Sequence, residues 1–392
     1  MGDIYATKIT AVLSRKGKEA RLAIEDNRFH VSGGGQPGDK GRLGAPGFSA
    51  EVTDCFREDD VPVLAVRLIE GEPAQGMPVE AEVDLSRQEL LSRMHSGEHV
   101  LSRILESRHE GLEVYKVAVA EEETAVFMRW EGDLGWDLLF EAEAAANEVI
   151  ASDLPVSIRL YDPAEAQSIE GLKANWNRLG NEPIRVVTIP GFDCIACSGT
   201  HVSSTGRIGG LLVTAYRGTA PDWEVKFTVH RERVLEAYSR VLRVLLRKVS
   251  CPLEKLEKVY DRLQEEKQVL SRALDKAKGM LALPWEAHRV GSKTLSVAVL
   301  PGFLPEMATP SLKALTESDP LSVGLVLIPS GEGQGGSFTL ACGAEAGIDL
   351  RRFLKDHPEL GARGGGAPSW VNGVTSAALP AEWTEALKSG IA

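Results

Sequence analysis

With 392 residues the chain exceeds the length of one ordinary domain, and a hydrophobic content of 43% is enough for several packed cores. Its formal net charge of −12 argues against tight, sequence-independent nucleic-acid binding through bulk charge, although a local basic path remains compatible with it. The absence of an apolar signal-peptide core and of a long uncharged apolar stretch predicts a cytoplasmic protein with no membrane partner. The five cysteines are sparse and odd in number, which favours reduced thiols over a disulfide framework.

Residues 1–85 are predicted to form a β-rich domain. Near its end Val79, Ala81 and Val83 alternate with acidic residues, which is the period-two pattern of a half-buried strand. Between the earlier strands lies a glycine-rich segment, residues 33–41, with the sequence GGGQPGDKG. Three successive glycines allow unusual backbone angles and the close approach of another chain or a ligand.

A helix is predicted to begin near Arg87, because Ser86 and Glu89 match a capping box that satisfies free backbone amides reciprocally. Apolar residues at helical spacing form one stripe of this helix: Leu90, Met94, Leu101, Ile104 and Leu105. His95 and His99 lie at the border of the stripe, where we expect the helix to pass from core to cleft.

The remainder of residues 86–230 mixes helix and strand patterns. A second helix is predicted over residues 137–150, and strands are predicted over residues 184–189, 211–213 and 225–229. This mixture indicates an α/β or α+β domain.

Two residue pairs in this domain have the donor atoms of a metal site. Cys197 and His201 repeat the four-residue spacing of His95 and His99, which on a helix places both side chains on one face. Nitrogen and sulfur ligands suit Zn²⁺ better than Mg²⁺ or Ca²⁺, which prefer oxygen. We expect the two pairs to converge on one zinc ion per chain.

Two other arrangements stay open at this point. Cys194 with Cys197 and the two helix histidines would make a closed structural site, which performs no chemistry. The helix motif HSGEH also fits the inverted zinc-peptidase signature, in which Glu98 is the general base and a carboxylate is the third ligand. Candidates for that carboxylate are Glu141, Glu143 and Glu148. The peptidase interpretation leaves Cys197 and the glycine-rich loop without a role.

Residues 231–285 are charged, poor in glycine and predicted to be helical, with an interruption at Pro252. Apolar residues of the second helix fall at heptad-like positions, namely Leu256, Tyr260, Leu263, Leu270 and Leu274. An antiparallel hairpin or packed spacer and a short coiled coil between chains both fit this pattern. Any homodimer contact is expected within residues 231–392.

Residues 286–392 return to a β/α pattern, with buried-strand runs over residues 295–300, 323–328 and 338–341. A second glycine cluster, Gly364, Gly365 and Gly366, follows Arg363. A tight turn there would expose backbone amides to phosphate, and a turn with purely structural glycines fits equally well.

The glycine-rich loop with Gln36, the helix histidine pair and the motif CSGTH that ends at His201 follow one another in this order. They resemble the editing domain of alanyl-tRNA synthetase and, more closely, the AlaX family of free-standing editing proteins, over residues 1–230. The helices and the glycine-rich tail resemble the C-terminal domain of that synthetase, as in the long form of AlaX. The expected fold is therefore α+β: a β-barrel-like glycine-rich domain (1–85), an α/β zinc editing domain (86–230), a helical spacer (231–285) and a glycine-rich α/β domain (286–392).

The resemblance implies ATP-independent hydrolysis, in trans, of mischarged tRNA(Ala), chiefly seryl-tRNA(Ala) and also glycyl-tRNA(Ala). By motif match the zinc ligands are His95, His99, Cys197 and His201. The expected catalytic residues are Gln36, Thr200 and Glu98, the substrate-binding residues are Asn27, Gly33, Gly34, Gly35 and Gln36, and the tRNA-binding residues are Arg363, Gly364, Gly365 and Gly366. A metal with three protein ligands and one free coordination position would serve chemistry better than a metal with four protein ligands. The sequence is compatible with either coordination. A zinc-stabilised tRNA-binding protein is the non-enzymatic alternative.

The chain departs from the family pattern just before the first glycines. Asn27 replaces a threonine expected to meet the substrate hydroxyl, and His30 and Val31 replace a Tyr-Pro pair. A site built to bond a serine hydroxyl rejects alanine because its polar groups are then left unpaired. An amide has a different reach from a threonine hydroxyl, so the preference between serine and glycine stays open.

Overall fold

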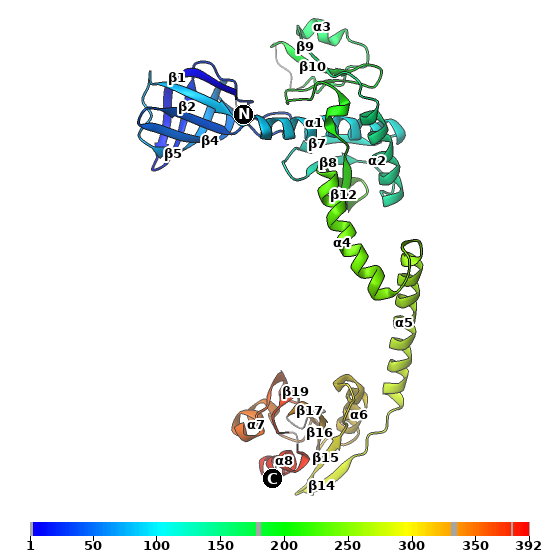
Figure 1. Cartoon of the computed structure of the whole chain (residues 1–392). Coiled ribbons are helices and arrows are strands. Elements are labelled where there is room, and N and C mark those ends of the chain that lie inside the picture. The colour runs from blue at the N-terminus through cyan, green and yellow to red at the C-terminus, as the bar shows by residue number, and fades with distance from the viewer. Residues whose placement is uncertain (1–2, 178–181, 331–334, 378, 392) are drawn as a thin grey trace. The chain divides into compact units, whose positions relative to one another are not determined.

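The computed structural model describes residues 3–177, 182–330, 335–377 and 379–391. The chain forms two compact units, Met1–Arg243 and Val244–Ala392 (Figure 1). As predicted, the fold is mixed α+β, with an N-terminal barrel and several further sheets. Within the described residues, no helix combines the length and the apolar character needed to cross a membrane.

The first unit begins with a closed six-stranded barrel in the order β1-β2-β5-β4-β3-β6 (Figure 1). Its strands are β1 (Asp3–Lys16), β2 (Glu19–Ile24), β3 (Gly41–Ala45), β4 (Phe48–Glu58), β5 (Val61–Glu70) and β6 (Pro78–Val83). The period-two prediction is confirmed, because Val79, Ala81 and Val83 are buried while the acidic residues between them are more exposed. The barrel-like prediction for the N-terminal region is confirmed as well.

Two helices and a four-stranded antiparallel sheet share the next hydrophobic core. The helices are α1 (Leu85–Arg108) and α2 (Trp136–Ala151), and the sheet, in the order β12-β13-β8-β7, contains β7 (Glu113–Ala118), β8 (Thr124–Arg129), β12 (Leu212–Thr219) and β13 (Asp222–Thr228). A three-stranded sheet in the order β11-β10-β9 contains β9 (Ser157–Tyr161), β10 (Ile184–Ile189) and β11 (Asp193–Ala196). Short helices complete the unit, namely α3 (Pro163–Gln167) and the 3₁₀ turn η1 (Thr205–Ile208).

The start of α1 differs from the predicted capping box. Asp84, not Ser86, is the N-cap, and its carboxylate accepts a hydrogen bond from the backbone N–H of Arg87. The helix therefore begins directly after β6. His95 and His99 are only 1% and 5% exposed.

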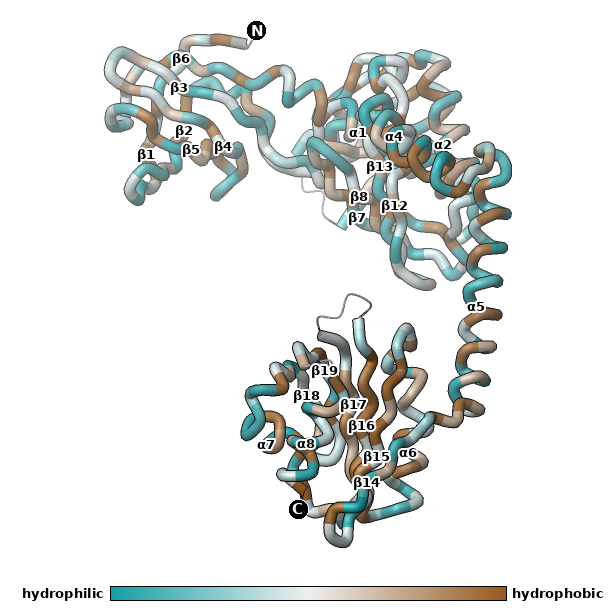
Figure 2. The backbone as a smooth tube through the Cα atoms, turned by 60° about the horizontal axis from the view of Figure 1, so that its bottom comes forward, coloured by the Kyte–Doolittle hydropathy of each residue, from teal (hydrophilic) through white to brown (hydrophobic). Residues whose placement is uncertain are grey.

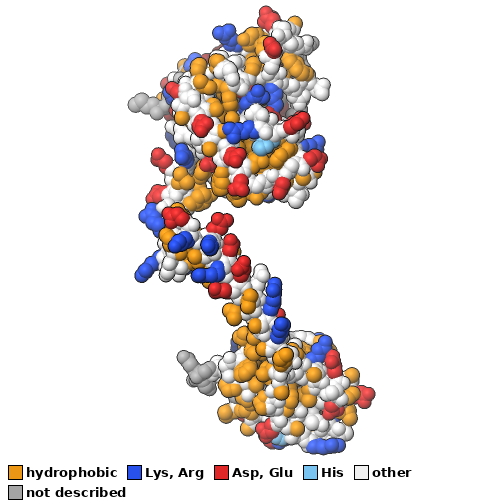
Figure 3. Space-filling model, turned by 90° about the vertical axis from the view of Figure 1, so that its right-hand side faces the viewer, with side chains coloured by type: hydrophobic (Ala, Val, Ile, Leu, Met, Phe, Trp, Pro, Cys, Tyr) orange, Lys and Arg blue, Asp and Glu red, His pale blue; other side chains and the backbone are white. Residues whose placement is uncertain are grey.

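Two exposed helices follow, α4 (Arg231–Val249) and α5 (Leu256–Met280), with the 3₁₀ turn η2 (Leu253–Lys255) and Pro252 between them as predicted. No residue of either helix is buried. Their exposed apolar residues include Tyr238, Val241, Tyr260, Leu263 and Leu270. Figure 3 shows basic, acidic and hydrophobic side chains interspersed over this helical segment. The hairpin and the coiled coil between chains both stay predictions.

The second unit contains a six-stranded sheet in the order β14-β15-β16-β17-β19-β18. Its strands are β14 (Glu286–Val290), β15 (Lys293–Val299), β16 (Ser322–Pro329), β17 (Gly336–Cys342), β18 (Arg363–Ala367) and β19 (Trp370–Thr375). Hydrophobic residues run along β15, β16 and β17 in Figure 2. Helix α6 (Pro305–Ser318) packs in one core, and α7 (Leu350–Asp356), η3 (Pro358–Leu360) and α8 (Pro380–Ile391) pack in another, so both faces of the sheet are covered.

The second glycine cluster forms part of a strand, not a tight turn. Gly364 and Gly366 lie in β18, the exposed edge of the sheet, while Pro368 and Ser369 make the turn into β19. An ideal Cβ at Gly364 or Gly366 would lie 2.1 Å from a carbonyl oxygen of β19. Close strand pairing therefore accounts for these two glycines.

Candidate metal centre

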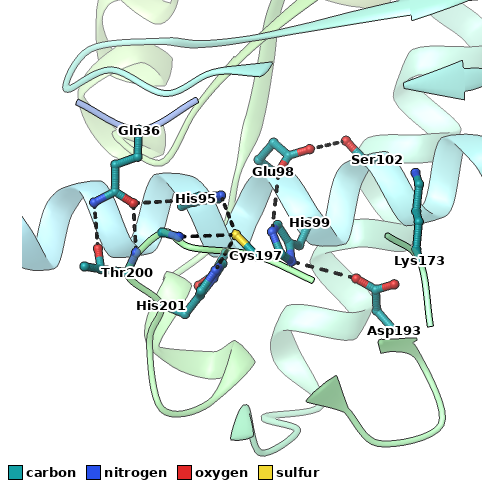
Figure 4. Close-up of polar contacts among 12 residues, drawn as sticks. Gln36, His95, Glu98, His99, Ser102, Lys173, Asp193, Cys197, Thr200 and His201 are labelled. Atoms are coloured by element: carbon teal, nitrogen blue, oxygen red, sulfur yellow. Dashed lines mark hydrogen bonds and ion pairs between the residues drawn. The ribbon is translucent and has the colours of Figure 1, made fainter. Parts of the chain in front are cut away.

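Helix α1 supplies two of the four expected ligands, His95 and His99, one turn apart (Figure 4). Gly97, between them, lies against the Phe227 ring of β13, where an ideal Cβ would come within 3.2 Å of the ring. The opposite face of α1 is therefore pressed against the sheet. This packing turns the two imidazoles away from β13 and toward the segment that follows β11.

Cys197 and His201 lie in that irregular segment, so their four-residue spacing is not that of a helix face. The Cys197 N–H donates to the Arg185 carbonyl at 3.0 Å, and the Gly199 N–H donates to the Cys197 sulfur at 3.4 Å. At Gly199 an ideal Cβ would lie only 2.0 Å from the His95 ring. A glycine is thus required where the bend passes beside His95.

The four side chains nevertheless converge. One donor atom from each of His95, His99, Cys197 and His201 lies within 4.8 Å of the others. The Cys197 Sγ is 3.3 Å from His95 Nε2 and 3.4 Å from His201 Nε2. Normal Zn–S and Zn–N bonds in a tetrahedron would separate sulfur and nitrogen by about 3.5 Å, so the donor set fits a metal ion.

Hydrogen bonds behind the ligands fix two of the imidazoles. His95 Nδ1 lies 2.8 Å from Gln36 Oε1, and His201 Nδ1 lies 3.1 Å from the Ser96 hydroxyl. Gln36 Oε1 also accepts from the Thr200 N–H at 3.0 Å, and Gln36 Nε2 donates to the Thr200 hydroxyl at 2.8 Å. Because this oxygen accepts, His95 carries its proton on Nδ1, and its Nε2 is left for a metal.

Carboxylates surround His99. Its Nδ1 has no hydrogen-bond partner within the described residues and lies 3.8 Å from Asp193 Oδ2. Its Nε2 lies 3.8 Å from Glu98 Oε2, and the other Glu98 oxygen accepts from the Ser102 hydroxyl at 2.6 Å (Figure 4). Burial raises the pKa of Glu98 to about 7 and that of Asp193 to about 6.

Burial also sets the protonation of the ligands themselves. It lowers the pKa of His99 to about 4 and holds the pKa values of His95 and His201 well below the usual histidine range. Neutral imidazole is the form that binds metal. Burial raises the pKa of the Cys197 thiol to about 11, so the thiol must lose a proton when it binds a metal.

A pocket of about 910 Å³ opens beside the four donors. Gly34 and Gly35, which were expected to bind substrate, line it, with φ angles of +60° and +81°. At Gly35 an ideal Cβ would lie 2.5 Å from the Val117 carbonyl oxygen, so the loop can pass this strand only as glycine. Gln36 and Thr200 are not among the pocket-lining residues, because they lie behind His95.

Asn27 does not reach the pocket. Its amide donates to the Phe29 carbonyl at 3.0 Å and accepts from the Phe29 N–H at 3.3 Å, within the barrel. His30 is held in the same turn, where its N–H donates to Asp39 Oδ2 at 2.8 Å. The departures from the family pattern at these positions therefore lie outside the pocket wall.

Several charged residues of the pocket were not predicted from the sequence, namely Arg103, Glu106, Lys173, Arg185 and Asp193. Lys173 Nζ lies 2.6 Å from Glu106 Oε2, across 67 positions of sequence. No local motif marks such pairs. The one available signal was the position of Arg185 in a predicted strand just before the cysteine motif.

The two rival metal arrangements do not form. Cys194 is not in the donor group. Glu143 accepts from the Val213 N–H at 2.7 Å, and neither it nor Glu141 or Glu148 joins the donor group. The closed site thus lacks its second cysteine, and the peptidase signature lacks its third ligand.

In the second unit Arg363 and Lys355 line a separate pocket of about 1130 Å³. Gly364, Gly365 and Gly366 are outside its lining and belong to the fully exposed strand β18. Of the expected tRNA-binding residues, Arg363 therefore lines this pocket and the three glycines do not.

Comparisons with known proteins agree with this site. The threonyl and alanyl tRNA synthetase second additional domain matches residues 184–224, which include Cys197 and His201. The alanyl-tRNA editing protein AlaX-L of Pyrococcus horikoshii is 26% identical over 387 residues, covering 95% of this chain and 92% of that protein. The alanine–tRNA ligase of Pyrobaculum arsenaticum is 26% identical over 405 residues, but the chain spans only 42% of that enzyme. The crystal structure of the C-Ala domain from Aquifex aeolicus alanyl-tRNA synthetase matches 26% of this chain and 93% of its own, with 20% identity and a TM-score of 0.24, which is too low to support a structural conclusion.

Proposed function

Because the chain is a homologue of the AlaX-L editing protein along 95% of its length, we propose that it hydrolyses mischarged tRNA(Ala). The observation that supports this most is the convergence of His95, His99, Cys197 and His201 beside a pocket. An aminoacyl ester is already activated, so the reaction needs water and no ATP. Water adds to the ester carbonyl, the ester C–O bond breaks, and the free amino acid and the terminal ribose hydroxyl are released.

We propose one Zn²⁺ per chain at these four residues, on the chemistry of the donor set. When bound, the ion supplies Lewis acidity next to the reacting ester. In this proposal Gln36 is a positioning residue. It fixes the tautomer of His95, and its hydrogen bond to the Thr200 hydroxyl holds the segment that contains Cys197 and His201.

Glu98 is the proposed general base. It lines the pocket, and the Ser102 hydroxyl orients one of its oxygens at 2.6 Å. Burial raises its pKa to about 7, which lets it accept a proton from water near neutral pH and release it again.

The proposed substrate is seryl-tRNA(Ala), with glycyl-tRNA(Ala) as a second. Gly34 and Gly35 present backbone without side chains to the pocket, which allows the aminoacyl end to approach closely. Arg363 and Lys355 of the second unit are proposed to contact the tRNA backbone. The exposed apolar residues of α4 and α5 fit a homodimer contact within residues 231–392.

The test is hydrolysis of purified seryl-, glycyl- and alanyl-tRNA(Ala) by the full chain. We expect selective loss of the seryl ester, abolished in a Cys197→Ala/His201→Ala variant. Cys194→Ala is the matched control, because this thiol is outside the donor group and its loss should leave activity intact. Retention of tRNA without cleavage of any ester by the folded, zinc-loaded chain would instead favour the non-enzymatic tRNA-binding protein.

A further inference from the structure

We propose that Arg185 is a further catalytic residue of this pocket, whose guanidinium binds the carbonyl oxygen of the substrate ester as that oxygen gains negative charge. The inference rests on the proposed ester hydrolysis. In this proposal the Arg185 side chain stabilises the negative charge that develops on the carbonyl oxygen when water adds to the ester.

Two reciprocal hydrogen bonds place Arg185 beside a metal ligand. The Cys197 N–H donates to the Arg185 carbonyl at 3.0 Å, and Arg185 Nη1 donates to the Cys197 carbonyl at 2.8 Å. Both residues line the same pocket. The guanidinium is therefore held next to the proposed metal site. If a metal bound there activates the ester carbonyl, that carbonyl must lie close to Arg185.

Among the described residues Arg185 has no ion pair with an acidic residue, whereas some other cations of the unit do. Arg87 lies 2.6 Å from Glu121, and Lys173 lies 2.6 Å from Glu106. Within the residues that the structure describes, no carboxylate forms an ion pair with Arg185, although its side chain is half-buried. A charge removed from water without a counterion is costly, and an anionic ligand would offset that cost.

Two carboxylates of the pocket lie beside a different donor residue than Arg185 does. Glu98 and Asp193 each lie 3.8 Å from His99, with Lys173 also in the pocket lining, whereas Arg185 contacts the segment of Cys197. An aminoacyl ester carries an ammonium group next to the carbonyl. The carbonyl oxygen would face Arg185 while the ammonium group faces the carboxylates.

A neutral replacement separates charge from positioning. Glutamine at position 185 keeps a polar amide but is shorter than arginine and has no charge, so the zinc content is measured to show whether the Cys197 segment stays in place. The matched control is Arg159→Gln, because Arg159 is an exposed arginine on the neighbouring strand β9 and does not line the pocket. Arg185→Lys restores the charge in a different shape.

The measurements are kcat, KM and zinc content of the full chain with seryl-tRNA(Ala) and with 3′-seryl-adenosine, which has no phosphate. We expect Arg185→Gln to lower kcat by about 100-fold on both substrates, the usual effect of removing one oxyanion donor. KM and zinc content should stay unchanged, Arg185→Lys should recover part of the rate, and Arg159→Gln should match wild type.

Three results would overturn the inference while leaving the proposed function in place. Arg185→Gln could hydrolyse both substrates as fast as wild type. Its defect could be confined to KM for the tRNA substrate, which would assign the guanidinium to a backbone phosphate. Its zinc content could fall with its rate, which would make the residue structural. Failure of the wild type on every ester would instead overturn the proposed function itself.

Discussion

The chain contains two glycine triplets, Gly33–Gly35 and Gly364–Gly366, that have very different surroundings. The first lies beside the Cys197 segment and contributes two residues with positive φ to the wall of the metal pocket. The second lies in the exposed edge strand β18, outside the pocket of its own unit. Similar glycine runs therefore serve close approach to a buried site in one unit and close pairing of strands in the other.

The difference shows that a glycine cluster indicates backbone freedom but not its use. What distinguishes the first cluster is the buried polar side chain that follows it, since Gln36 is 2% exposed and makes hydrogen bonds to His95 and Thr200. No equivalent follows the second cluster in the described residues, where Ala367 ends the strand and the turn residues Pro368 and Ser369 come after it. The first cluster therefore belongs to the proposed metal site, and the second does not.

Among the variants that test this comparison, Gln36→Ala is expected to have the largest effect, a loss of zinc affinity. The variant removes the oxygen that accepts from His95 Nδ1 and from the Thr200 N–H, so the imidazole is no longer held in the metal-binding tautomer. We expect zinc affinity to fall by about 10- to 100-fold, measured by competition with a chelator. Gln264→Ala, an exposed glutamine of α5, is the control and should bind zinc like wild type. Equal affinity in both variants would contradict the positioning role.

A smaller effect is expected from alanine within the glycine clusters. Gly35→Ala forces a Cβ to within 2.5 Å of the Val117 carbonyl oxygen at a φ of +81°, so we expect a loss of about 1–3 kcal/mol in the free energy of unfolding. At Gly365 an ideal Cβ meets nothing within 4 Å. Gly365→Ala should therefore change stability by less than about 0.5 kcal/mol. Urea denaturation, monitored by hydrogen exchange in each unit, measures the free energy of unfolding of both variants. Equal losses of stability in the two variants would contradict the difference between the two glycine clusters.

The smallest effect is expected from Arg363→Gln in the second unit. Loss of one phosphate contact should weaken tRNA binding a few-fold and reduce the slope of log affinity against log salt by about one. Hydrolysis of 3′-seryl-adenosine, which has no tRNA backbone, should be unchanged. An unchanged salt slope would show that Arg363 does not contact the tRNA backbone.

Local patterns predicted much of the secondary structure. The strand predicted over residues 184–189 matches β10, and the helix predicted over residues 137–150 lies within α2. Both segments have hydrophobic periodicity that agrees with how they pack. The strand nature of Gly364–Gly366 was missed, because glycine has a low strand propensity and the pairing with β19 comes from the neighbouring segment.

The donor residues of the site could also be found in the sequence, but not the network around them. Gln36 and His95 are 59 positions apart, and Arg185 carries no motif of its own. Cys197 and His201 have a helical spacing by coincidence, because a bend at Gly199 brings them together instead. Contacts of this kind depend on tertiary packing, which short spacing rules do not describe.

In the proposed function, a metal ion held in the first unit enables ester hydrolysis. The most direct measurement is the rate of seryl-tRNA(Ala) hydrolysis by the full chain after complete removal of metal and again after addition of zinc. We predict that activity disappears with the metal and returns with one equivalent of zinc per chain. Full activity in rigorously metal-free protein would contradict the claim.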